Sequence, residues 1–240
     1  MADIVETLVE PFLRECDRLL GRGYSAVLHG SVVRGEYLEG WSDVNLLLVL
    51  ESATPDVLGA LTMPFAFWAK SRQAPPLLLS RPEWRRAADV FPVEITDIRS
   101  AYRVLRGDDP LAEVTVRPAD LRSALERDLR GRLLRLRQGF VALAGDSGAL
   151  AGLARNTAPS VVVLLRAALV LTGAQLPPTR GDVVATAGLV IGFPSAHLAE
   201  ILAHLGDGTW NCTPDCFAGY IAAVESTVRY VDNLSLGDRP

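Results

Sequence analysis

The spacing of apolar residues along the chain changes near its middle. Up to residue 115, segments with helical spacing alternate with short β-rich runs, whereas from Pro118 the spacing is almost entirely helical. The early pattern predicts helices at residues 4–20, 55–72 and 81–89, and strands at residues 24–30, 43–51, 75–80 and 91–98. Helices that alternate with strands indicate an α/β (α+β) domain with a mixed sheet of about four or five strands, which we place at residues 1–115.

The second half predicts an all-α helical bundle at residues 116–240. Leucines at positions 121, 125, 129 and 133 continue into Leu136 and Phe140 and form one stripe of a long helix, which Asp120 is placed to cap. Further helices are expected at residues 150–172, 181–190, 195–205 and 214–234, because glycine and proline gather between these segments. With an α/β domain before the bundle, the ligand cleft is expected between the two domains.

Composition and charge narrow the class of protein. The chain has 240 residues, of which 49% are apolar and 22% charged, as in a folded globular protein. Its net charge of −4 provides no global basic field, so extended nucleic-acid binding is not expected. The longest apolar run, residues 160–171, is interrupted by Arg166 and is shorter than a membrane-spanning helix, which predicts a buried core helix and no membrane association.

The cysteines and the arginines add two expectations. Cys16, Cys212 and Cys216 are odd in number and the chain begins without a signal-peptide pattern, which favours the cytoplasm. Cys212 and Cys216 have no second ligand pair and no histidine near them in the sequence, so a zinc site is not expected there. Arg166 must find a partner inside an apolar helix, either a carboxylate in a structural ion pair, which we favour, or a group in the substrate cleft.

The arginine-rich helix from residue 121 to residue 140 has two interpretations. It carries six arginines, which a polyanion could contact, but Glu126 precedes Arg130 by four positions and Asp128 precedes Arg132 by four. This spacing is typical of a solvated helix with internal ion pairs. We therefore expect an ion-paired surface helix.

The segment LHGSVVRGEYLEGWSDVN holds the candidate chemistry. A strand that ends at His29 runs into Gly30 and Ser31, a small pair that permits a close turn and opens a short helix whose N–H groups can hold a phosphate. The next strand is expected to begin at Asp43. Because side chains alternate along a strand, Asp43 and Asn45 are expected on the same face, near the glycine-serine turn.

These residues resemble the signature of the DNA polymerase β-like nucleotidyltransferase superfamily, in particular its small bacterial branch. The residues that match are Gly30, Ser31, Arg34, Gly35, Ser42 and Asp43. Asn45 departs from the pattern, because the superfamily has a second aspartate there. The segments FPVEITDI and VLRGDDPL, followed by a helical domain, are also similar to proteins of the kanamycin-nucleotidyltransferase type.

The resemblance implies a magnesium-dependent site for a nucleoside triphosphate. It assigns the catalytic roles to Asp43 and Glu94, the metal-binding positions to Asp43, Asn45 and Glu94, and nucleotide binding to Gly30, Ser31, Arg34 and Ser42. Arg34 has an alternative role in ion pairs with Glu36 or Glu39. The third acid is either Glu94 or Asp97, and we favour Glu94 because it falls in the middle of the predicted strand. The implied reaction transfers a nucleoside monophosphate to a hydroxyl of an acceptor.

Asn45 leaves the function open between different classes. An amide oxygen can bind a cation but carries no charge and cannot act as a base, so metal binding should weaken. One reading is an active nucleotidyltransferase. The second is a catalytically impaired nucleotide-binding or protein-interaction module with the same fold, and the third is a structural homodimer formed through the apolar helices at 160–172 and 214–234.

Overall fold

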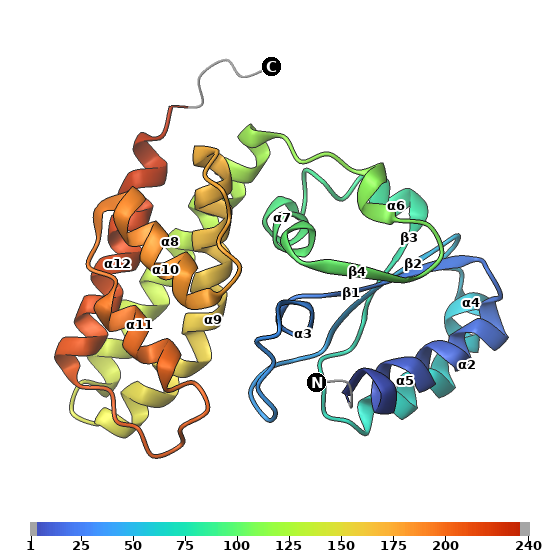
Figure 1. Cartoon of the computed structure of the whole chain (residues 1–240), viewed down its shortest axis with the longest axis horizontal. Helices are drawn as coiled ribbons and strands as arrows, with labels where there is room; N and C mark the ends of the chain where they lie inside the picture. Colours follow the sequence, from blue (N-terminus) through green and yellow to red (C-terminus); the bar gives the residue numbers. More distant parts are fainter. Residues whose placement is uncertain (1–3, 236–240) are drawn as a thin grey trace. The chain divides into compact units, whose positions relative to one another are not determined.

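A computed structural model describes residues 4–235 of the chain. The chain divides into two compact units (Figure 1). Unit 1 comprises Met1–Val90 and Ile98–Thr115, and unit 2 comprises Phe91–Asp97 and Val116–Pro240.

Unit 1 is built on a mixed sheet, as the sequence predicts. Within residues 4–235 the sheet has four strands: β1 (Tyr24–His29), β2 (Asn45–Leu50), β3 (Leu77–Ser80) and β4 (Tyr102–Arg106). Their order is β3-β2-β1-β4, where β2 and β3 are parallel and β1 is antiparallel to both of its neighbours. This topology places β1 and β2, which flank the candidate motif, at the centre of the sheet.

Helices cover the sheet of unit 1. They are η1 (Val5–Val9), α2 (Glu10–Leu20), α3 (Ser31–Arg34), α4 (Pro55–Ala60), α5 (Thr62–Ala69), α6 (Arg81–Arg85) and η2 (Pro110–Glu113). On one face, α2 and α5 lie beside the sheet (Figure 1), and the rings of Phe12 and Trp68 pack edge to face with centroids 5.0 Å apart. Leu28 and Leu48 of the central strands join this core. Their burial against aromatic side chains fixes which face of the two strands points inward.

The short helix α6 packs against β2 and β3. Its start is fixed by a capping box, in which Ser80 accepts from the Glu83 N–H and Glu83 accepts from the Ser80 N–H. The buried indole of Trp84 donates to the carbonyl oxygen of Pro110 at 2.7 Å. Because the indole N–H has this acceptor, the large Trp84 side chain is buried without an unpaired hydrogen-bond donor.

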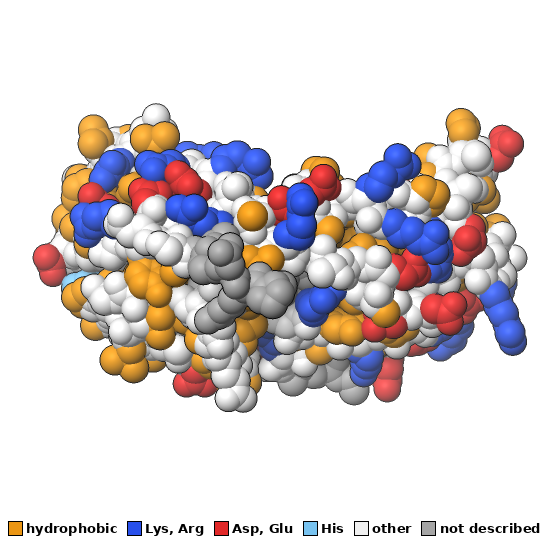
Figure 2. All heavy atoms as spheres, turned by 90° about the horizontal axis from the view of Figure 1, so that it is seen from above, with side chains coloured by type: hydrophobic (Ala, Val, Ile, Leu, Met, Phe, Trp, Pro, Cys, Tyr) orange, Lys and Arg blue, Asp and Glu red, His pale blue; other side chains and the backbone are white. Residues whose placement is uncertain are grey.

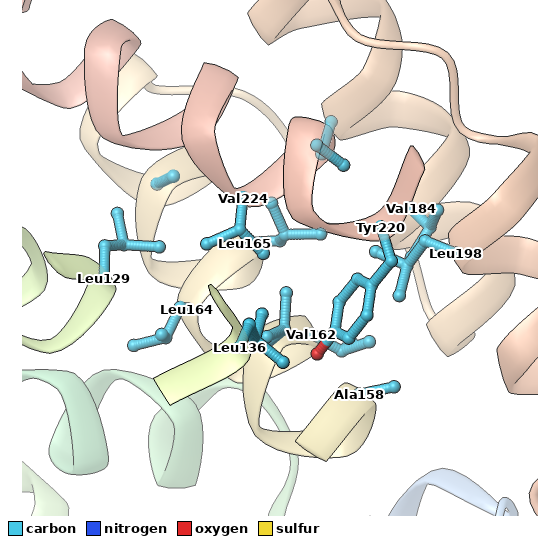
Figure 3. Close-up of a cluster of buried hydrophobic side chains, with 14 of the residues drawn as sticks. Leu129, Leu136, Ala158, Val162, Leu164, Leu165, Val184, Leu198, Tyr220 and Val224 are labelled. Carbon is cyan, nitrogen blue, oxygen red and sulfur yellow. The ribbon is translucent and has the colours of Figure 1, made fainter. Parts of the chain in front are cut away.

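Unit 2 is a helical bundle, as predicted. Its helices are α8 (Pro118–Leu143), α9 (Ser147–Thr172), α10 (Arg180–Ala187), η3 (Gly188–Gly192), α11 (Ala196–Ala203) and α12 (Pro214–Asn233). Figure 3 shows side chains of α8, α9 and α12 converging on one core, with Leu136, Leu165 and Val224 among them. The apolar residues of α9 and α12 pack into this core, which accounts for their hydrophobicity within a single chain.

Helix α9 is the predicted buried core helix. By length and composition alone it could cross a membrane, but 61% of its most apolar window is buried. The long helix α8 begins earlier than expected: Arg117 is its N-cap residue, and Asp120 lies inside the first turn, where its carboxylate pairs with Arg117 at 2.7 Å. The prediction that Asp120 caps this helix is therefore wrong, because Pro118 already adopts helical geometry.

The segment FPVEITDI is a helix and not the predicted strand. Helix α7 (Pro92–Ser100) spans it, and the hydroxyl of Thr96 donates to the carbonyl oxygen of Pro92 at 2.7 Å. The buried residues Pro92, Ile95 and Ile98 follow one another at intervals of three, which is a helical period. The strand beside β1 comes later in the chain, at β4.

The arginine-rich helix α8 carries one of the ion pairs that its spacing predicts, between Glu126 and Arg130. Arg130 lies 3.2 Å from Glu126 and 2.9 Å from Asp232 of α12. Arg127 lies 3.5 Å from Asp128. On the face that Figure 2 shows, basic and acidic side chains occur close together, as expected for a solvated surface with mixed charges.

Candidate functional site

A tight turn at Gly30 connects β1 to the one-turn helix α3. Gly30 has φ 77° and ψ −144°, a conformation that residues with a Cβ rarely adopt. Its N–H donates to the carbonyl oxygen of Ala101 at 3.1 Å, and its own carbonyl oxygen accepts from the N–H of Arg34 at 3.0 Å. Gly35, in the left-handed conformation, ends the helix. The turn is therefore fixed on both sides by backbone hydrogen bonds.

Asn45 packs against this turn. In the antiparallel register of β1 and β2, Asn45 is directly opposite His29, so the two side chains share one face of the sheet. A Cβ atom at Gly30 would lie 2.8 Å from Nδ2 of Asn45, closer than real Cβ contacts. The absence of a side chain at Gly30 thus lets the Asn45 amide approach the backbone of the turn.

Asp43 lies at the head of β2, two residues before Asn45. The strand itself begins at Asn45, yet the alternation extends further back: Val44 is buried, while Asp43 is exposed and Asn45 half-buried. Oδ1 of Asp43 accepts from the N–H of Ala74 at 3.2 Å. The N–H of Val44 donates to Oε1 of Gln73 at 2.7 Å. Both contacts are with the connection between α5 and β3: the first holds the Asp43 carboxylate, and the second holds the backbone at the head of β2.

The predicted nucleotide-binding residues Ser42 and Arg34 both have local partners. Ser42 Oγ accepts from the N–H of Leu38 at 3.0 Å, which stabilises the connection before β2. Nη2 of Arg34 donates to Oγ of Ser100 at 2.6 Å. Their assignment to nucleotide binding stays a prediction.

The two candidates for the third acid belong to unit 2 and sit on α7. Glu94 is exposed on this helix. Asp97 pairs with Arg166 of α9 at 3.4 Å, and their side chains are 15% and 6% exposed. The structural ion pair expected for Arg166 is thus confirmed. Glu94 does not lie in the middle of a strand, because the segment is helical, and the choice of third acid stays a prediction.

Three further residues adjoin the motif and were missed in the sequence. His29 lies beside Asn45 across the strand pair, while Gln73 and the Ala74 N–H contact the head of β2. Of these three residues, His29 is the one with a sequence signal, because it is a histidine at the end of a buried strand. Gln73 and Ala74 carry no signal, because their role comes from a fold that brings residues 31 positions apart into contact.

Tyr102 continues this row of the sheet on the other side of His29. Its hydroxyl donates to Oδ2 of Asp109 at 2.9 Å, and this hydrogen bond, with burial, raises the pKa of Tyr102 above its ordinary value. Tyr102 also lines a hollow of about 590 Å³ together with Leu28 and Val32. Neither Asp43 nor Asn45 lines this hollow.

The donor set at the head of β2 fits a divalent cation with hard oxygen ligands. Asp43 offers a carboxylate that is exposed to solvent and held by one backbone N–H. Asn45 offers an amide oxygen, since its Nδ2 is the atom nearest to Gly30. Magnesium accepts such oxygen ligands and keeps several waters. The set carries one negative charge fewer than a pair of aspartates.

One comparison with known proteins concerns the N-terminal region and a second concerns the fold of the chain. Residues 9–100 match the sequence model of the family described as nucleotidyltransferase domain. The structure is similar to the crystal structure of spectinomycin adenyltransferase from Enterococcus faecialis with ATP and spectinomycin, with a TM-score of 0.53 and 10% identity, over 93% of this chain and 99% of that chain.

At this low identity, the structural similarity concerns the fold. No curated protein sequence matches the chain. The motif at Gly30 to Asp43 lies inside the matched range, 9–100. Residues 9–100 are therefore similar to a nucleotidyltransferase domain, in agreement with the resemblance of the motif to the DNA polymerase β-like superfamily.

Proposed function

We propose that this protein is a cytoplasmic nucleotidyltransferase that transfers a nucleoside monophosphate from a nucleoside triphosphate to a hydroxyl of an acceptor, with magnesium. A domain at residues 1–115 carries the nucleotide site, and a helical domain at 116–240 follows it. The observation that carries the proposal is the approach of Asn45 to the Gly30 turn, with Asp43 two residues before it. The backbone that we propose to bind phosphate is thus next to a side chain that we propose to bind the metal.

The proposed roles follow from the chemistry of each group. The N–H groups that open α3 have no partner within the helix, so the turn at Gly30 and Ser31 can donate to phosphate oxygens. Gly30 contributes through its lack of a side chain, because its own N–H is bonded to Ala101. Arg34 and Ser42 would steady the phosphates after exchanging their present partners.

Magnesium would be held by Asp43 and the amide oxygen of Asn45, and the third carboxylate that the family resemblance implies is Glu94. When bound, magnesium neutralises charge on the phosphates during in-line transfer. We prefer Glu94 to Asp97 as the third metal ligand because their surroundings differ. Asp97 already neutralises the nearly buried guanidinium of Arg166, whereas Glu94 is exposed.

Asn45 itself supports a second candidate function. Replacement of a carboxylate by an amide removes a charge from the metal site and a base from the vicinity of the acceptor hydroxyl. A domain that binds nucleotide without turnover, or that contacts a protein partner, would keep the Gly30 turn and tolerate this change.

Turnover separates these two candidates. The protein is incubated with magnesium, each of the four nucleoside triphosphates and a panel of hydroxyl acceptors, and release of pyrophosphate is measured. Spectinomycin belongs in the panel because the structurally similar adenyltransferase was crystallised with it. An active enzyme releases pyrophosphate only with an acceptor, and Asp43→Asn abolishes the release.

Asn45→Asp serves as the reference for a complete metal site. Pyrophosphate release by Asn45→Asp but not by the natural chain would support the impaired module. Release that is unaffected by Asp43→Asn would contradict the proposed site.

A further inference from the structure

A second cluster of metal-binding side chains lies in unit 2. His197 and Glu200 are on α11, three positions apart and thus on neighbouring parts of one helical face. Cys216 is in the first turn of α12. One ligand atom from each of these three residues lies within 4.8 Å of the other two. His197 is distant from Cys216 in the sequence, which argued against a metal site. In the fold the two residues are close together.

The cluster is held by its surroundings. Thr213 caps α12 by accepting from the N–H of Cys216 at 3.1 Å, which fixes the first turn. A Cβ atom at Gly219, one turn later, would overlap the imidazole of His197, so the glycine lets the ring lie against α12. The two helices thus meet closely at the position of the cluster.

Cys212 provides a second thiol. It is fully buried, Cys216 is 3% exposed, and both are free thiols. The N–H of Cys212 donates to the carbonyl oxygen of Ser147 at 3.0 Å, which holds this residue at the start of α9. Cys212 precedes Cys216 by four positions and comes directly before Thr213, the residue that caps α12.

The ligand types select among metals. Thiolate, imidazole and carboxylate together suit zinc, whereas magnesium and calcium prefer oxygen ligands only. Zinc bonds of about 2.0 to 2.3 Å in a tetrahedron place ligand atoms roughly 3.5 Å apart. The observed limit of 4.8 Å is wider by an amount that small side-chain rotations can close.

We propose that His197, Glu200 and Cys216 bind one zinc ion, with Cys212 as the fourth ligand. The Cys216 and Cys212 thiols each lose a proton to solvent as the metal binds. A closed set of four protein ligands makes the site structural. Its role is to fasten the connection between α11 and α12 to both helices, and all four ligands belong to unit 2.

Cobalt titration of the full chain tests this proposal. Metal is removed with a chelator under reducing conditions, and Co²⁺ is added as a spectroscopic probe for zinc. We expect a thiolate-to-cobalt charge-transfer band that saturates at about one equivalent and disappears when zinc is added. Cys216→Ser and His197→Ala should lose the band. Cys16→Ser, which changes a buried free cysteine of unit 1, is the matched control and should keep it.

Glu200→Gln provides the variant least able to disturb folding, because this side chain is exposed. Circular dichroism checks that each variant folds, and Glu200→Gln should weaken cobalt binding at least tenfold. The proposal is overturned if the natural chain shows no charge-transfer band, or if Glu200→Gln and a folded Cys216→Ser bind as the natural chain does. A disulfide between Cys212 and Cys216 in protein purified under reducing conditions would also overturn it.

Discussion

Replacement of Gly30 by alanine probes the contact on which the nucleotide site depends. The backbone of Gly30, at φ 77° and ψ −144°, lies close to a region that only glycine populates freely, and an alanine there costs about 1–3 kcal/mol. The new Cβ would also lie 2.8 Å from Nδ2 of Asn45. Moving the Asn45 side chain off its rotamer adds about 0.5–1.5 kcal/mol. We therefore expect Gly30→Ala to lower the free energy of unfolding by about 2–4 kcal/mol.

Gly40→Ala is the matched control for this change. Gly40 has φ 78°, but a Cβ there would have no atom within 4 Å, so only the backbone cost applies. Urea unfolding followed by tryptophan fluorescence measures both variants, because Trp41, Trp68 and Trp84 lie in unit 1. Asn45→Ala, combined with Gly30→Ala, should recover the part of the loss that comes from the contact.

The reasoning is refuted if Gly30→Ala costs no more than Gly40→Ala, or if Asn45→Ala recovers nothing. In either case the Asn45 side chain does not lie against the Gly30 turn. We also expect Gly30→Ala to weaken magnesium-dependent nucleotide binding, whereas Gly40→Ala should leave it unchanged.

Two further predictions concern buried groups. Asp97→Asn leaves the guanidinium of Arg166 beside a neutral amide, so the free energy of unfolding, measured by urea denaturation, should fall by about 3 kcal/mol. Asp89→Asn is the control: this side chain is exposed, so the change should be less than about 0.5 kcal/mol. Equal losses in the two variants would contradict the ion pair. Burial, with Asp17 and Glu15 nearby, raises the pKa of Cys16 from 9.0 to about 12. The native thiol should therefore react slowly with a disulfide reagent at pH 8, and its contribution to stability, complete below pH 9, should be lost as the pH rises toward 12. Alkaline unfolding that is just as steep in Cys16→Ala would contradict this.

Most elements of the fold could be predicted from hydrophobic spacing, because it reflects which face each element buries. The β-rich run at β2 is an example: its five residues after Asn45 are all buried at the centre of the sheet. The leucine stripe of α8 likewise packs into the core of unit 2. In these segments local pattern and tertiary packing agree.

The prediction failed where packing overrode local preference. FPVEITDI is rich in β-branched residues, which favour strands, but it folds as α7 because Pro92, Ile95 and Ile98 find buried positions at helical spacing. Strand β4, YRVLR, was missed because two of its five residues are arginines and none is fully buried. Its place beside β1 depends on pairing with residues far away in the sequence.

The candidate site was predictable only where it is local in sequence. The Gly30 turn and the alternation of Asp43 and Asn45 follow from one short segment. The contacts of Gln73 and Ala74 with the head of β2, and the approach of His197 to Cys216, join distant segments and carry no motif. Such contacts follow from the fold as a whole.

Magnesium-dependent nucleotide binding tests the central claim most directly. The natural chain, Asn45→Asp and Asp43→Asn are titrated calorimetrically with a non-hydrolysable ATP or GTP analogue, each with and without Mg²⁺. We predict saturable binding by the natural chain that requires Mg²⁺, roughly tenfold tighter binding by Asn45→Asp, which is about 1.4 kcal/mol, and no magnesium-dependent binding by Asp43→Asn. Absence of binding by both the natural chain and Asn45→Asp would contradict a nucleotide site at the Gly30 turn.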